Sequence, residues 1–165
     1  MITSLECADA EDFVLRPVAI ADLDFLFKAR NHPDIISLSA SKMAVTIEEH
    51  TKWFHHQMSS GNKCFFVIQE RMSGDSCGYV RIDPDGIQGC ITVVLLPGFQ
   101  GRGWGSVIVP KVVEMAKAVL PHVKFLNAEI QKGNDRSISV FKKAGFVFKQ
   151  SQKPGSVTEI WTLVL

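Results

Sequence analysis

The sequence contains no long apolar run and no excess of charge of one sign. No segment approaches the ~18 consecutive apolar residues that span a bilayer, and the first residues lack the basic and apolar regions of a signal peptide. The 18 basic and 17 acidic side chains give a formal net charge of +1, which provides no electrostatic footprint for nucleic acid or an anionic membrane. We therefore expect a cytoplasmic protein that binds neither.

Cysteine and tyrosine are also scarce. The four cysteines form no Cys-x-x-Cys pair, and no histidine lies at zinc-finger spacing from them. Cys64, Cys77 and Cys90 lie in or beside strand-like runs, which is typical of free, buried thiols in a reducing cytosol. The pattern predicts no metal site. The single tyrosine, Tyr79, leaves one candidate for a phenolic proton donor.

What the chain does contain is enough apolar material for one core. Its 165 residues, 46% of them hydrophobic, favour a single domain over 1–165, with the polar residues 1–11 loose. Alternation and turn residues predict seven strands, and helical spacing predicts four helices, with a turn at 31–34. The expected strands are 13–16, 64–70, 77–83, 89–95, 124–130, 146–150 and 158–164. The expected helices are 22–30, 46–59, 102–120 and 135–144.

Loop lengths indicate how these elements connect. Short turns between the strands at 64–70, 77–83 and 89–95 predict antiparallel pairing. The crossover from strand 89–95 through a helix to strand 124–130 requires parallel pairing. The sequence therefore predicts an α/β (α+β) domain with a mixed seven-stranded sheet.

A glycine-rich loop lies between strand 89–95 and the helix that follows it. Gly101, Gly103 and Gly105 alternate there, and such a loop leaves backbone N–H groups free at a helix N-terminus, where they bind anions. A dinucleotide-binding loop would need glycine where this chain has Ser106, and a Walker A loop would need Gly-Lys-Ser/Thr. From these residues alone, a pyrophosphate-binding turn and a plain tight turn both remain open.

Two motifs resemble those of a known family. Gln100-Gly101-Arg102-Gly103-Trp104-Gly105, with Pro97 before it, resembles the acetyl-CoA signature Q/R-x-x-G-x-G/A of the GNAT superfamily of N-acetyltransferases. The segment from Asn134 to Phe146 resembles the second motif of that family, in which an asparagine opens a helix that ends in K-x-G-F. Both motifs occur in the family's order and on the expected elements.

The resemblance implies a GNAT fold in which strand 89–95 splays from strand 124–130 to form a V-shaped slot for acetyl-CoA. The N–H groups of residues 101–106 would hold the pyrophosphate, and the N–H of Leu95 would polarise the thioester carbonyl. Ordinary helix packing remains the alternative for Ser137 and Phe141. The implied cofactor-binding residues are Val93, Val94, Leu95, Gln100, Gly101, Arg102, Gly103, Trp104, Gly105, Ser106, Asn134, Ser137, Phe141 and Lys143.

The expected chemistry departs from the family at one position. Many members carry a tyrosine where this chain has Phe141, which cannot donate a proton to the leaving thiolate. Tyr79 or a water would then supply the proton, or the CoA would leave as the thiolate. Glu129, near the end of strand 124–130, is the candidate general base, acting through a water. The alternative for Glu129 is an exposed strand glutamate.

The N-terminal third provides the candidate acceptor site. Arg30-Asn31-His32-Pro33-Asp34 and the segment from Ile47 to Phe54 are similar to R-N-x-P-[DE] and I-x-x-E-x-H-x-x-W-[FL] of one GNAT subgroup. That subgroup acetylates UDP-linked 4-amino-4,6-dideoxy sugars in pseudaminic acid synthesis. A looser similarity extends to spermidine and ribosomal-protein acetyltransferases. The expected substrate-binding residues are Arg30, Asn31, His50, Trp53 and Arg81, with Arg30, His50 and Arg81 as phosphate contacts.

Three functions follow from these residues. The first is an N-acetyltransferase that acts on an amino-sugar nucleotide, a small-molecule amine. The second is an acetyltransferase that acts on protein N-terminal or lysine amines, or on polyamines. The third is a non-catalytic acyl-CoA-binding module, suggested by Phe141 alone. For Trp53 a place in the core remains the alternative, and for His50 a surface or capping position. A homodimer is common in the family.

Overall fold

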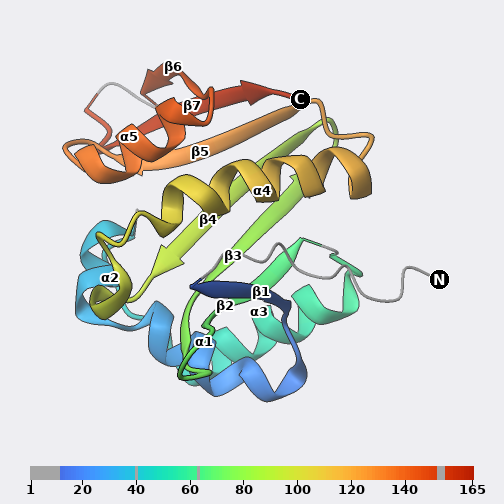
Figure 1. The fold of residues 1–165 in the computed structure, drawn as a ribbon, viewed down its shortest axis with the longest axis vertical. Helices are drawn as coiled ribbons and strands as arrows, with labels where there is room; N and C mark the ends of the chain where they lie inside the picture. The colour runs from blue at the N-terminus through green and yellow to red at the C-terminus, as the bar shows by residue number, and fades with distance from the viewer. Residues whose placement is uncertain (1–11, 40, 63, 152–154) are drawn as a thin grey trace.

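The computed structural model describes residues 12–39, 41–62, 64–151 and 155–165. The expected loose start at 1–11 and part of the last expected turn lie outside these residues. One mixed seven-stranded sheet runs through the described part, as the sequence predicts (Figure 1). Its strand order is β1-β2-β3-β4-β5-β7-β6. The strands are β1 (Phe13–Pro17), β2 (Phe65–Glu70), β3 (Ser76–Asp85), β4 (Gln88–Leu95), β5 (Phe125–Gln131), β6 (Val147–Ser151) and β7 (Thr158–Val164).

Five α-helices accompany the sheet in the described residues, one more than expected. They are α1 (Leu23–Arg30), α2 (Pro33–Leu38), α3 (Ile47–Ser59), α4 (Trp104–Val119) and α5 (Asp135–Lys143). The additional helix α2 begins where a turn was expected at 31–34. His32 caps it by accepting a hydrogen bond from the N–H of Asp34, and Pro33 occupies its first turn. None of the helices in the described residues is long and apolar enough to cross a membrane.

Local chemistry explains where two other helices begin. Thr46 and Glu49 form the expected capping box of α3, each side chain bonding the backbone N–H of the other residue. Helix α4 starts at Trp104 rather than at 102, because Gly103 caps it in a left-handed conformation with a φ of 81°.

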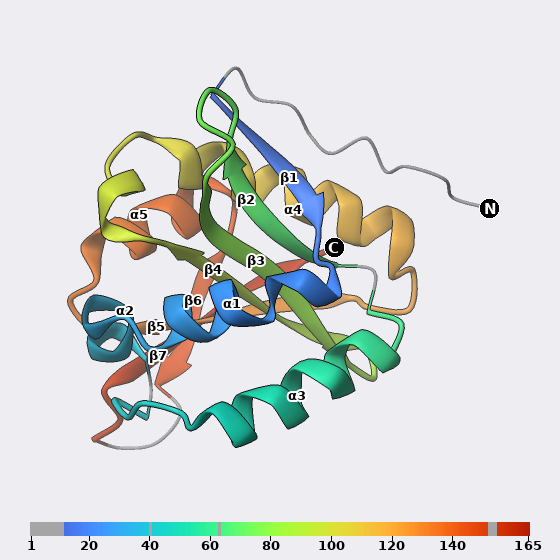
Figure 2. The same cartoon turned by 90° about the horizontal axis from the view of Figure 1, so that it is seen from below.

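The helices cover the two faces of the sheet in separate groups (Figures 1 and 2). Helices α4 and α5 pack on one face over a large core that includes Ile82, Val112 and Leu126. Helices α1 and α3 pack on the other face over a smaller cluster that includes Leu26 and Phe54. The faces alternate along each strand, so every second residue of β3, β4 and β5 points toward α1 and α3.

The one parallel pair of the sheet, β4 with β5, is short. Only Gln88–Cys90 of β4 are in register with Phe125–Asn127 of β5, although β4 continues to Leu95 and β5 to Gln131. Beyond Cys90 the two strands part, and Figure 1 shows them diverging. This confirms the predicted V between these strands.

Candidate active site

A cavity of about 1340 Å³ opens where β4 and β5 part. Its lining comes from the C-terminal residues of β4 and β5, from the glycine loop and the starts of α4 and α5, and from α1, α2 and α3. Most sites for one small ligand measure roughly 300–1,000 Å³. The cavity therefore has room for two substrates that meet in the V.

The backbone at the end of β4 offers a hydrogen-bond donor to this cavity. The N–H of Leu96 donates to the carbonyl of Cys77 on β3 at 2.9 Å. Because donors alternate along an antiparallel ladder, the N–H of Leu95 points away from β3 and toward the V. The Leu95 carbonyl accepts a hydrogen bond of 2.7 Å from Gln100 Nε2, which ties the glycine loop to the strand. Leu95 thus presents an N–H group where β5 no longer pairs with β4.

The glycine loop turns by means of left-handed backbone. Gly101 and Gly103 have φ values of 78° and 81°, and both line the cavity. The N–H groups of Trp104 and Gly105, the first of α4, have no preceding helical turn to bond and carry the positive end of the helix dipole. The N–H of Ser106, in contrast, donates to the Gly103 carbonyl at 3.1 Å. Gly105 serves packing as well, because a Cβ at this position would lie 3.4 Å from Val140 of α5. The loop therefore has the form of a pyrophosphate site.

Gly103→Ala should weaken acetyl-CoA binding because alanine is strained at this φ by about 1–2 kcal/mol. We expect the KM for acetyl-CoA to rise while kcat at saturation changes little. Gly98→Ala in the same loop is the matched control, since Gly98 has an ordinary φ and open space around its Cβ position. Steady-state kinetics on both variants measure this. Equal KM values for the two variants would show that the loop does not bind acetyl-CoA.

Helix α5 forms the other wall of the V. Asn134 caps the helix by accepting a hydrogen bond of 3.2 Å from the N–H of Ser137, and both residues line the cavity. Phe141 also lines the cavity and packs edge-on against Phe146, with ring centroids 5.0 Å apart. This wall supplies shape and hydrogen-bonding groups, while Phe141 has no proton to give.

Three residues of the expected site have side chains away from the cavity. Arg102 binds Glu70 at 2.7 Å and the carbonyl of Gly98 at 3.0 Å. Lys143 is exposed and does not line the cavity. The side-chain amide of Asn31 is occupied by the N–H and carbonyl of Val45, at 2.8 and 2.9 Å, so it anchors the segment after α2. Arg102 and Asn31 therefore support neighbouring structure, while Lys143 faces solvent.

Trp104 lines the cavity, but its ring belongs to the core. The ring is 4% exposed and lies 5.2 Å from that of Phe13 and 5.8 Å from that of Phe99. At the start of α4, Trp104 can offer a ligand its backbone N–H, while its buried indole Nε1 makes no hydrogen bond within the described residues. Val93, Val94 and Ser106 also line the cavity, as expected.

The strand register shows how far along the V each polar residue of the sheet lies, from the paired part of β4 and β5 toward their open ends. Tyr79 pairs with Val94, and Arg81 pairs with Thr92. Glu129 lies two residues beyond Asn127, the partner of Cys90, and is therefore level with Thr92. Three residues separate Thr92 from Leu95, or about 10 Å along a strand. Glu129 lines the cavity, but it stands deeper in the V than the Leu95 N–H.

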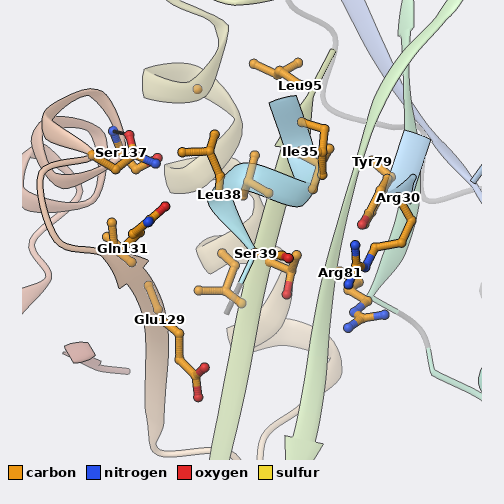
Figure 3. A pocket seen from close by; sticks show the side chains of 18 of the residues that line it. Arg30, Ile35, Leu38, Ser39, Tyr79, Arg81, Leu95, Glu129, Gln131 and Ser137 are labelled. Atoms are coloured by element: carbon orange, nitrogen blue, oxygen red, sulfur yellow. Dashed lines mark hydrogen bonds between the residues drawn. The ribbon is translucent and has the colours of Figure 1, made fainter. Parts of the chain in front are cut away.

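Two arginines point into the same part of the cavity beside Tyr79, opposite β5 with Glu129 and Gln131 (Figure 3). The Arg81 guanidinium lies 4.7 Å from the ring centre of Trp53, and its Nε is 2.8 Å from Asp83 Oδ2 without being aligned for a hydrogen bond. Arg30 Nη2 donates to Ser41 Oγ at 3.2 Å and to the Met43 carbonyl at 3.3 Å.

The second terminal nitrogen of Arg30 has no partner. Within the described residues, Arg30 Nη1 is buried without a hydrogen bond, and no carboxylate pairs with this guanidinium. Burial raises the pKa of Tyr79 and keeps its hydroxyl protonated, although the two arginines oppose the shift. This part of the cavity therefore holds the Arg81–Asp83 ion pair and, on Arg30, a buried guanidinium N–H group without a partner.

His50 differs from the expected phosphate contact. It is 4% exposed, and burial lowers its pKa, with further lowering by the charges of Arg30 and Arg81. His50 is therefore neutral at pH 7 and adds no positive charge. It reaches the cavity from α3, and its ring centre lies 5.1 Å from that of Trp53.

Several lining residues were not expected from the sequence. Ile35, Leu38 and Ser39 lie between β5 and the two arginines, because α2 crosses the mouth of the V (Figure 3). Gln131 holds α2 there: with its amide oriented to satisfy both groups, it donates to the Ser37 carbonyl and accepts from Lys42 Nζ. The sequence could have indicated Asp83 as a lining residue, because it follows Arg81 by two residues and therefore lies on the same face of the strand.

Comparison with known proteins agrees with this geometry. The chain is 23% identical over 133 residues to the acetyltransferase PseH of Campylobacter jejuni, covering 80% of this chain and 81% of that protein. It superposes on the spermidine N-acetyltransferase of Vibrio cholerae, solved with CoA and spermine, with a TM-score of 0.78 at 14% identity over 94% and 96% of the two chains. The ribosomal-protein-alanine N-acetyltransferase of Brucella melitensis gives 0.73 at 21% identity over 92% and 99%.

The sequence model of the acetyltransferase (GNAT) domain matches residues 12–147, most of the chain. The split between β4 and β5, the glycine loop at the start of α4 and the cavity between them are the structural counterpart of that match. The chain therefore belongs to the GNAT family of acetyl-CoA-dependent N-acetyltransferases.

Proposed function

We propose that this enzyme transfers acetyl from acetyl-CoA directly to the primary amine of a small, anionic acceptor, a nucleotide-linked amino sugar. The observation that carries the proposal is the arginine pair in the acceptor half of the cavity, above all the buried and unpartnered Nη1 of Arg30. A buried cationic donor without a partner is unfavourable, so the site favours a ligand that brings negative charge.

The chemistry of arginine points to phosphate. A guanidinium offers paired N–H groups that match two oxygens of a phosphate. The spermidine acetyltransferase is 14% identical to this chain, so its likeness concerns the fold and not the acceptor. The similarity to PseH, though only 23%, agrees with the subgroup motifs around Arg30 and His50.

The residues for transfer follow from the cavity. The amides of 101–106 and the side chains of Asn134 and Ser137 would hold the CoA arm, and the N–H of Leu95 would bind the thioester carbonyl oxygen. The amine nitrogen attacks the carbonyl carbon, the C–N bond forms and the C–S bond breaks. Tyr79, protonated and beside Val94 in the register, or a water then supplies a proton to the thiolate.

A thermal-shift series tests the proposal. Acetyl-CoA alone should stabilise the protein, by about 2.7 kcal/mol at 100 times its Kd. UDP or a UDP-linked amino sugar should stabilise it separately, and both ligands together should add. Stabilisation by acetyl-CoA with no response to any UDP compound would contradict the sugar-nucleotide acceptor. Spermidine or an alanine-terminated peptide would then be tested as the acceptor.

A further inference from the structure

Several buried polar atoms, each of a residue that lines the cavity, make no hydrogen bond within the described residues. Besides Arg81 Nε and Trp104 Nε1 they are Arg30 Nη1, His50 Nε2 and Asp83 Oδ1. Among these atoms, His50 Nε2 can take up a proton near neutral pH, because imidazole titrates in that range. The atom is shielded from bulk water, and the residue reaches the cavity from α3.

The surroundings of the two ring nitrogens of His50 differ. The backbone of Leu23 favours the protonated ring, as a carbonyl that faces a ring N–H does. Because Nε2 has no partner, the donor to Leu23 is Nδ1. The neutral ring therefore carries its proton on Nδ1 and presents a free lone pair on Nε2, the arrangement of a histidine general base.

The position of His50 along the V also suits proton transfer from the reacting amine. The end of α3 lies near Ile82, whose carbonyl accepts a hydrogen bond of 2.8 Å from Asn62. Trp53 is level with Arg81, and His50 is three residues, about 4.5 Å of helix, further from Asn62. This places His50 on the Tyr79 side of Arg81. Tyr79 pairs with Val94, next to Leu95, whereas Glu129 is level with Thr92.

We propose that His50 Nε2 is the proton acceptor for the amine during acetyl transfer. The proposal rests on the acetyltransferase activity and not on the identity of the acceptor. As the nitrogen attacks and the C–N bond forms, the nitrogen becomes positively charged and loses a proton to Nε2. The C–S bond breaks, and the imidazolium proton then returns to the thiolate or to water.

The charged groups around His50 fit this role. Arg30 from α1 and Arg81 from β3 face it, Tyr79 from β3 stays neutral, and its own helix contributes Glu49, which is exposed. Asp83 and Glu129 also line the cavity. The two cations that keep His50 neutral also disfavour an ammonium ion, so the acceptor arrives as the free amine. A weak base suffices once the attack has made the nitrogen acidic.

Nitrogen-15 NMR of the whole protein tests the tautomer without any acceptor. At pH 7 we expect His50 to carry its proton on Nδ1 and to titrate below 6.5, the direction given by its lowered pKa. Resonances that place the proton on Nε2, or show a charged ring at pH 7, would overturn the proposal. His55 of the same helix is exposed and provides an internal reference.

Kinetics of His50→Gln test the proton transfer. General-base catalysis contributes about 10²–10⁴-fold, so kcat/KM should fall at least 100-fold, and the decline of kcat below pH 6.5, which reports groups of the enzyme–substrate complex, should disappear. Glutamine still accepts a hydrogen bond but takes no proton in this range, and His55→Gln is the matched control. The assay follows thiol release with a UDP-linked 4-amino-4,6-dideoxy sugar, or with spermidine or an alanine-terminated peptide if the sugar is not acetylated.

Two kinetic outcomes would overturn the assignment. One is a His50→Gln enzyme that keeps the wild-type rate and the wild-type decline in rate at low pH, the acid limb of the pH profile. The other is an acid limb that survives in His50→Gln and vanishes in Glu129→Gln, which would assign the proton to the carboxylate. Failure of the sugar with activity on another amine contradicts the proposed acceptor and leaves the test of His50 intact.

Discussion

Replacing Leu95 with proline should lower kcat by about 100- to 1000-fold, the cost of removing one oxyanion donor. Proline lacks the N–H group that the end of β4 directs into the V. The loss to the fold is small, because this N–H makes no ladder bond to β3. Acetyl-CoA should still stabilise the variant in a thermal-shift assay, since the glycine loop at 101–106 is unchanged.

Leu95→Ala is the control for this experiment. It keeps the N–H and removes the side chain, which packs against the core on the α4 face. Its kcat should stay close to the wild-type value even though its stability falls. A folded Leu95→Pro enzyme with normal kcat, or an equal loss in Leu95→Ala, would show that the backbone N–H does not stabilise the reacting carbonyl.

Arg30→Gln should lower kcat/KM for a UDP-linked amino sugar by roughly 10- to 150-fold. This corresponds to the loss of a charged hydrogen bond worth about 1.5–3 kcal/mol. Arg30→Lys should lose less, because it keeps the charge without the planar pair of donors. Thermal stability without ligand should fall slightly, because Nη2 loses its bonds to Ser41 and Met43 while the unpartnered Nη1 loses none. Stabilisation by acetyl-CoA should also persist.

Lys28→Gln is the matched control, with the same change of charge on the exposed side of α1. Its kcat/KM should equal that of the wild type. If both variants lose activity equally, the effect comes from net charge and not from a contact in the cavity. If Arg30→Gln stops responding to acetyl-CoA, the arginine belongs to the cofactor half of the cavity and the acceptor proposal fails.

Local signals in the sequence predicted much of this architecture. The capping box at Thr46, the glycines before α4 and the short turns between β2, β3 and β4 each act through neighbouring residues, so their consequences could be read directly. The pattern at 31–34 contained both a turn and a helix start, and only the packed structure decides between them. That helix, α2, brings Ile35 and Leu38 into the cavity.

The roles of the site residues depended on contacts that no pattern shows. Asn31 sits inside a motif of the sugar-acetylating subgroup, yet its amide is used by Val45. His50 was expected to bind phosphate, but burial and two nearby arginines leave it neutral. The sequence predicted that Glu129 lies near the point where β4 and β5 part. Its position along the strand relative to Leu95 followed only from the strand register.

The most direct test of the account compares two acceptors in the wild-type enzyme. Thiol release from acetyl-CoA is measured with a UDP-linked 4-amino-4,6-dideoxy sugar and with the same amino sugar without the nucleotide. The arginine pair predicts a kcat/KM at least about 100-fold higher for the nucleotide-linked sugar, from two charged contacts of about 1.5–3 kcal/mol each. Equal values for the two sugars, or faster acetylation of spermidine than of either, would contradict it.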